Sequence, residues 1–107
     1  MYDCSRNYID GAWVESTSAD LNDIINPSTE KSIGQVNFGS PQDVDRAVAA
    51  ARAAFAAFSQ WSVEERLELL GSIQDAYKTR WNEIAAAITA EMGAPAEFSM
   101  RAQTGSG

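Results

Sequence analysis

The first part of the chain alternates short apolar runs with turn-forming residues, a pattern typical of β-strands. An Asp10-Gly11 pair separates the first two runs, and it indicates a tight hairpin because both turn positions need positive φ. Asn26-Pro27-Ser28-Thr29 predicts a second turn, since proline presets φ and Asn and Ser bond their own backbone. The predicted strands lie at residues 8–9, 12–14, 21–25 and 33–38. We therefore expect a strand region at about residues 8–38.

After Gly39 the apolar residues recur at spacings of three and four, which is helical periodicity. Ser40 is a good N-cap and Pro41 fits the first helical position. The apolar stripe consists of Val44, Val48, Ala51, Phe55 and Phe58. This pattern predicts a helix at about residues 41–59. Asp43 falls in its first turn, where the helix dipole favours an acid, and we expect it to be solvated.

A second helical segment begins at Ser62, which forms a capping-box pattern with Glu65. Its apolar face consists of Leu67, Leu70, Ile73, Tyr77, Trp81, Ile84, Ile88 and Met92. Gly93 and Pro95 supply a stop, so the helical segment is expected over residues 63–92. A helix of that length is long for a small domain, and we expect a break near residues 79–82. A third helix is expected at about residues 96–103.

Together these elements predict an α+β fold, with short N-terminal strands and a hairpin followed by two or three helices. With 107 residues, 45% of them hydrophobic, the chain is within the range of one globular domain. The aromatic side chains lie at strand or helix spacing, so we expect them in the core. The members of this group are Trp13, Trp61, Tyr77, Trp81 and Phe98.

Composition excludes several classes of chemistry. The chain has no histidine, which removes the commonest general base and metal ligand. Cys4 is the single cysteine, so an intrachain disulfide is excluded; a lone thiol and no visible signal peptide favour the cytoplasm.

The net charge of −7 argues against nucleic acid and anionic membranes as partners. The Gly-Ser tail, residues 104–107, is interpreted as a loop rather than a phosphate cradle, which would need a following helix.

The order of these features resembles the N-terminal segment of the aldehyde dehydrogenase superfamily. The resemblance covers residues 8–103, and no single motif in it is catalytic. It is carried by "YIDGAWVES" (8–16), "DIINPSTEKSIGQV" (23–36), "PQDVDRAVAAARAAFAAFSQWSVEERLELL" (41–70) and "AAAITAEMGAP" (85–95). The resemblance implies that residues 1–107 are an N-terminal fragment of the NAD(P)-binding domain, which is a Rossmann-like α/β fold in the complete protein.

The resemblance also implies an activity that this chain cannot complete. Members of the superfamily oxidise aldehydes to carboxylic acids with NAD or NADP, through a thiohemiacetal on a cysteine and a glutamate-activated water. None of those catalytic or cofactor motifs occurs here, and Cys4 precedes the resemblance. We therefore expect the chain alone to be inactive, with the remainder of the dehydrogenase chain as its partner and a homo-oligomer as the complete enzyme.

Two residues correspond to a structural site for a monovalent cation that many members hold. The resemblance implies that the backbone carbonyl of Ile25 and the carboxylate of Glu91 are ligands there, and oxygen ligands suit a hard cation. The superfamily often has aspartate where Glu91 stands. The alternative interpretation of Glu91 is a surface acid near a helix end.

A second hypothesis treats the chain as a truncated, non-catalytic module for interaction or oligomerisation. Its motivation is the apolar helix stripes, which lack a sheet to pack on and would bind a partner. We accordingly expect molten behaviour or oligomers if the chain is alone. A helical scaffold unrelated to dehydrogenases is the third alternative, and the ordered match of hairpin, turn and helices argues against it.

Overall fold

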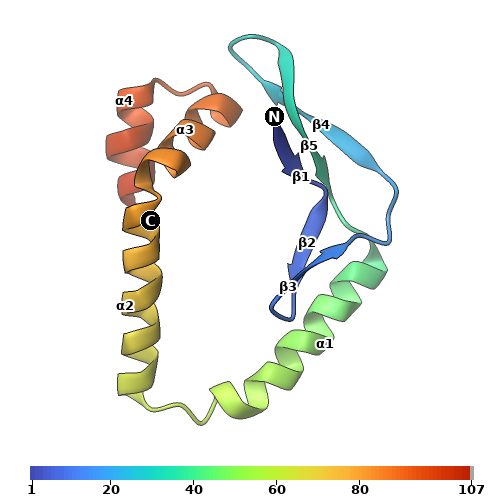
Figure 1. Ribbon diagram of the computed structural model, residues 1–107, viewed down its shortest axis with the longest axis vertical. Helices are drawn as coiled ribbons and strands as arrows, with labels where there is room; N and C mark the ends of the chain where they lie inside the picture. The colour runs from blue at the N-terminus through green and yellow to red at the C-terminus, as the bar shows by residue number, and fades with distance from the viewer. Residues whose placement is uncertain (107) are drawn as a thin grey trace. The chain divides into compact units, whose positions relative to one another are not determined.

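The computed structural model describes residues 1–106, which form two compact units (Figure 1). The first unit comprises Met1–Ile25 and Ser32–Gln60, and the second comprises Asn26–Lys31 and the chain from Trp61 on. Strands occupy the first part of the sequence and helices the second, which confirms the predicted α+β class. None of the helices in residues 1–106 is both long and apolar enough to cross a bilayer.

The first unit contains two small sheets. Strands β2 (Arg6–Ile9) and β3 (Ala12–Glu15) form the predicted hairpin, in which Tyr8 pairs with Trp13. Asp10 and Gly11 have φ of 54° and 76°, as the turn requires. The rings of Tyr8 and Trp13 meet edge to face at 5.2 Å. Both side chains are nonetheless exposed, so the expectation that Trp13 belongs to the core was wrong.

The second sheet has the strand order β1-β5-β4, built from Tyr2–Cys4, Lys31–Asn37 and Leu21–Asn26. Strand β1 runs parallel to β5, with Tyr2 opposite Gly34 and Cys4 opposite Val36. The sequence pattern did not predict β1. A Cβ built on Gly34 would lie 2.2 Å from the carbonyl oxygen of Tyr2. The absence of a side chain at Gly34 is therefore what allows β1 to pair here.

Helix α1 (Pro41–Phe58) completes the first unit and begins as the sequence predicts. Ser40 Oγ accepts from the backbone N–H of Asp43, and the Asp43 carboxylate accepts from the backbone N–H of Ser40, which makes a full capping box. The apolar stripe of α1 is not covered: Val44, Val48 and Phe55 are all exposed.

The second unit is helical except for the turn at residues 26–31. Helix α2 (Val63–Thr79) starts at the Ser62–Glu65 capping box, and α3 (Trp81–Met92) follows after Arg80. The break expected at residues 79–82 is thus confirmed. Gly93 ends α3 in the left-handed region. The third helical segment is irregular: α4 (Ala96–Phe98) continues as a π-helical turn, η1 (Ser99–Gln103), and a 3₁₀ turn, η2 (Thr104–Ser106).

The interior of the structure is small. Ala85 is the only hydrophobic side chain among residues 1–106 that is buried, with 3% of its surface exposed. Phe98 and Leu70, for example, are 53% and 60% exposed. Tyr77 and Trp81 are half-buried and meet edge to face at 5.9 Å, in agreement with the predicted packing of these two rings. A domain of this length normally buries well over half of its unfolded surface, so most of the apolar surface here is unpartnered.

Candidate functional site

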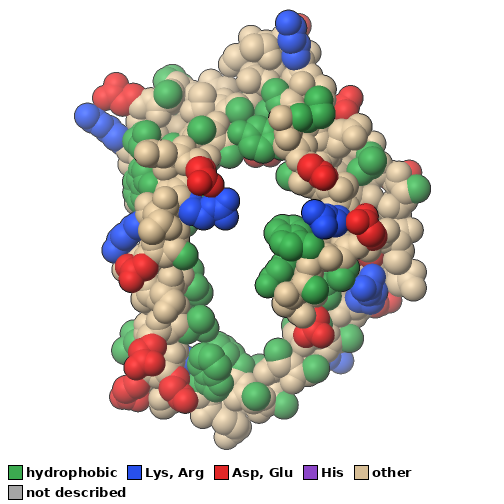
Figure 2. Space-filling view, in the orientation of Figure 1, with side chains coloured by type: hydrophobic (Ala, Val, Ile, Leu, Met, Phe, Trp, Pro, Cys, Tyr) green, Lys and Arg blue, Asp and Glu red, His purple; other side chains and the backbone are tan. Residues whose placement is uncertain are grey.

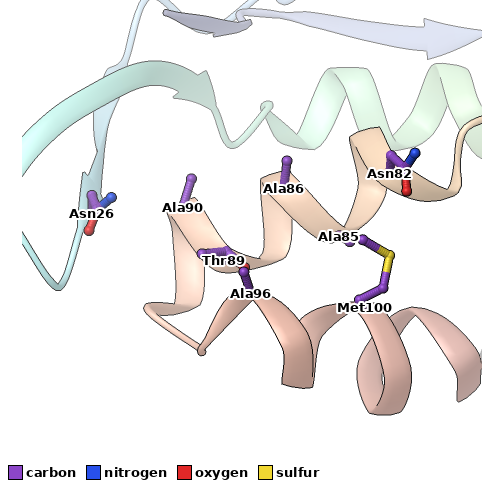
Figure 3. A pocket seen from close by; sticks show the side chains of 8 residues that line it. All are labelled: Asn26, Asn82, Ala85, Ala86, Thr89, Ala90, Ala96 and Met100. Atoms are coloured by element: carbon purple, nitrogen blue, oxygen red, sulfur yellow. The ribbon is translucent and has the colours of Figure 1, made fainter.

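An apolar groove lies on α3 in the second unit (Figure 3). It has a volume of about 380 Å³ and is lined by Asn26, Asn82, Ala85, Ala86, Thr89, Ala90, Ala96 and Met100. Ala96 and Met100 come from the C-terminal helical segment and point toward α3, whereas Ala86 and Ala90 point away from that segment. The lining includes two amides and a hydroxyl but no ionisable group. This groove could hold an apolar group, and it offers no acid, base or nucleophile.

A polar network fixes the segment that forms one wall of this groove. Thr89 Oγ1 donates to Ser99 Oγ at 2.9 Å, and Thr104 Oγ1 donates to the carbonyl oxygen of Ser99 at 2.8 Å. The Tyr77 hydroxyl donates to the carbonyl oxygen of Thr104 at 2.9 Å. Ser99 and Thr104 are fully buried, so these bonds replace the ones that water would make. The network has a structural role, because each hydroxyl already has a partner.

The same hydrogen bonds show that residues 104–106 of the Gly-Ser tail belong to the packed C-terminal segment. Thr104, Gly105 and Ser106 form a 3₁₀ turn, and the hydroxyl of Ser106 donates to the carbonyl oxygen of Gln103. The hydroxyl of Thr104 is buried and bonded to Ser99, so it does not face an incoming phosphate. Gly107, the last residue of the predicted loop, lies outside the described residues.

Asp43 is the one carboxylate in residues 1–106 that is buried, with 4% of its surface exposed. Ser16 Oγ donates to it at 2.5 Å, and the backbone N–H groups of Thr17 and Ser40 donate at 3.1 and 3.0 Å. The Ser16 hydrogen bond is the main reason why the pKa of Asp43 falls from 3.8 to about 2. The expectation that Asp43 is solvated was wrong, because these partners from the β3–β4 loop cover it.

Asp43 therefore joins a loop to a helix start rather than performing catalysis. A carboxylate with a lowered pKa stays ionised at neutral pH and is a poor general base. Thr17 Oγ1 and Ser40 Oγ also share a hydrogen bond in this cluster. The sequence predicted Ser40 as an N-cap and placed Asp43 in the first helical turn. It did not predict the bonds from Ser16 and Thr17, which span more than twenty residues.

The two residues of the predicted cation site lie in different units. Ile25 is in strand β4, one residue before Asn26, and Glu91 is an exposed side chain in the last turn of α3. Ile25 and Glu91 thus do not belong to the same unit, and the cation site stays a prediction. Residues 1–106 bring no three His, Cys, Asp or Glu side chains together in a way that could hold a metal ion. Cys4 is an exposed free thiol in β1.

The turn next to Ile25 has a defined geometry of its own. The carbonyl oxygen of Asn26 accepts from Glu30 N at 2.8 Å, and Asn26 Oδ1 accepts from Ser28 N at 2.8 Å. Pro27 and Ser28 lie against Gly93 at the end of α3: a Cβ built on Gly93 would be 2.9 Å from Pro27 Cγ. The turn and the helix end are thus in close contact within the second unit.

The sequence of this chain is similar to those of known proteins. A family model described as "Aldehyde dehydrogenase family" matches residues 13–106. A 3-succinoylsemialdehyde-pyridine dehydrogenase from a Pseudomonas species is 47% identical over 95 residues, which are 89% of this chain and 20% of that protein.

Solved structures agree in backbone as well as in sequence. An aldehyde dehydrogenase from Bartonella henselae superposes with a TM-score of 0.96 at 34% identity, over 98% of this chain and 22% of its own. Aldehyde dehydrogenase C (AldC) from Pseudomonas syringae, solved with NAD⁺ and octanal, superposes with a TM-score of 0.93 at 42% identity, over 95% of this chain and 21% of its own. The chain therefore spans about a fifth of the length of the relatives it matches.

Proposed function

Because the chain belongs to the aldehyde dehydrogenase family, we propose that it serves as the N-terminal part of an NAD(P)-dependent enzyme that oxidises aldehydes to carboxylic acids. The observation that carries this proposal is the family match over residues 13–106. The solved relative with bound NAD⁺ and octanal supports NAD as the cofactor and an aldehyde as the substrate. NADP is the alternative cofactor.

In this proposal the chain is a scaffold and contains no catalytic residue. The only thiol among the described residues, Cys4, is exposed and lies before the matched stretch. The nucleophilic cysteine that forms the thiohemiacetal, and the base that activates water, would come from the remainder of the dehydrogenase chain. The segment would be the first part of the NAD(P)-binding domain, and the complete enzyme a cytoplasmic homo-oligomer; an exposed free thiol suits a reducing compartment.

The described residues do not fit a nicotinamide dinucleotide by themselves. Binding a pyrophosphate normally uses a glycine-rich loop that opens a helix, and a carboxylate usually holds the ribose. The groove on α3 is lined mainly by alanines and carries neither a loop of that kind nor an ionisable group. In this proposal the cofactor site lies in the part of the enzyme that this chain does not contain.

A chimera tests the proposal directly. The chain is fused to the part of P. syringae AldC that follows the matched segment, and NADH formation from octanal and NAD⁺ is measured. We expect the chimera to be active and the 107-residue chain alone to be inactive. Activity of the chain alone would contradict the assignment of the catalytic groups to the remainder. A chimera that is folded, as judged by cooperative thermal unfolding, but inactive would contradict the proposed function.

The exposed apolar helix faces support a second candidate function, that of a non-catalytic interaction or oligomerisation module. Leu67, Leu70 and Phe55 are each at least 60% exposed, and a monomer rarely displays so many large apolar side chains. This module would self-associate or bind a full-length relative without turnover. Sedimentation of the chain over a wide concentration range distinguishes the alternatives: a stable monomer with no affinity for a relative would exclude the module.

A further inference from the structure

We draw no further inference here: the strongest candidate, the exposed hydrophobic patch on helix α2 that includes Leu67, Leu70 and Ile73 (Figure 2), carries no proposal because nothing in the structure shows what covers it.

Discussion

Gly93 closes helix α3 directly against the ring of Pro27, which lies more than sixty residues earlier in the sequence. A Cβ built on Gly93 would stand 2.9 Å from Pro27 Cγ and 3.1 Å from Ser28 Oγ, and Gly93 has a φ of 72°. Two independent constraints therefore select glycine: the left-handed backbone and the absence of space for a side chain. This contact attaches the Asn-Pro turn to the helices of the second unit.

Replacing Gly93 with alanine should destabilise the AldC chimera. A non-glycine residue in the left-handed region costs about 1–3 kcal/mol, and the contact with the Pro27 ring adds to that. The measurement is the midpoint of urea-induced unfolding. Gly71→Ala is the matched control, because Gly71 lies inside α2 with no neighbour within 4 Å of a built Cβ. That control should stabilise the chimera by about 0.5–1 kcal/mol, so a loss of stability there would contradict the argument.

Replacing Gly34 with alanine should release strand β1. The added Cβ would meet the carbonyl oxygen of Tyr2, a backbone atom that cannot move without breaking the pairing. Overpacking of this kind costs about 1–3 kcal/mol, which corresponds to about a 5- to 140-fold increase in the opening of β1. Hydrogen exchange at the amides of residues 2–4 is the measurement. Gly105→Ala serves as the control, since its Cβ would make only an ordinary contact with Trp81.

Replacing Asp43 with asparagine should change how stability depends on pH. The folded pKa of Asp43, about 2, is below its ordinary value of 3.8, chiefly because of the Ser16 hydrogen bond. A lowered folded pKa stabilises the protein above about pH 4, and this stabilisation is lost as pH falls toward 2. The native chimera should therefore lose its advantage over Asp43→Asn in that range, as measured by urea midpoints. Asp45→Asn, which changes an exposed acid of the same helix, should keep the native pH profile.

Replacing Glu91 with glutamine tests the predicted cation site. If Ile25 and Glu91 contribute ligands in the complete enzyme, KCl should stabilise the native chimera more than tetramethylammonium chloride does at equal ionic strength. The expected gain is about 1.4 kcal/mol at a cation concentration ten times Kd. Glu91→Gln should remove this difference, while Glu97→Gln, in an exposed ion pair with Arg101, should retain it. The same salt response in both variants would argue for Glu91 as a surface acid.

Features set by neighbouring residues could be predicted from the sequence. The Asp10-Gly11 hairpin, the Ser40 N-cap, the Ser62–Glu65 capping box and the stop at Gly93 each depend on a few consecutive side chains. Their physical causes, positive φ at a turn and unsatisfied N–H groups at a helix start, act over one or two turns of chain. The break after Thr79 was expected only from the length of the helical segment.

Features set by distant partners could not be predicted in this way. Strand β1 is three residues long and exists because Gly34 lets Tyr2 approach. Asp43 is buried because Ser16 and Thr17 reach it from the preceding loop. Trp13 is a further example. It lies on a regular strand, but the spacing of residues along a strand does not determine whether another element covers the Trp13 ring.

The single buried alanine, Ala85, has a consequence for how a complete protein of this kind is made. Domains usually begin to fold from the N-terminus during synthesis, at about 5–20 residues per second. The matched 95 residues are 20% of the Pseudomonas enzyme, so about 380 of its residues lie outside the match. At that rate their synthesis takes roughly 20–80 seconds. In such an interval Leu67, Leu70 and Ile73 of α2, each more than half exposed in this structure, would be open to chaperones.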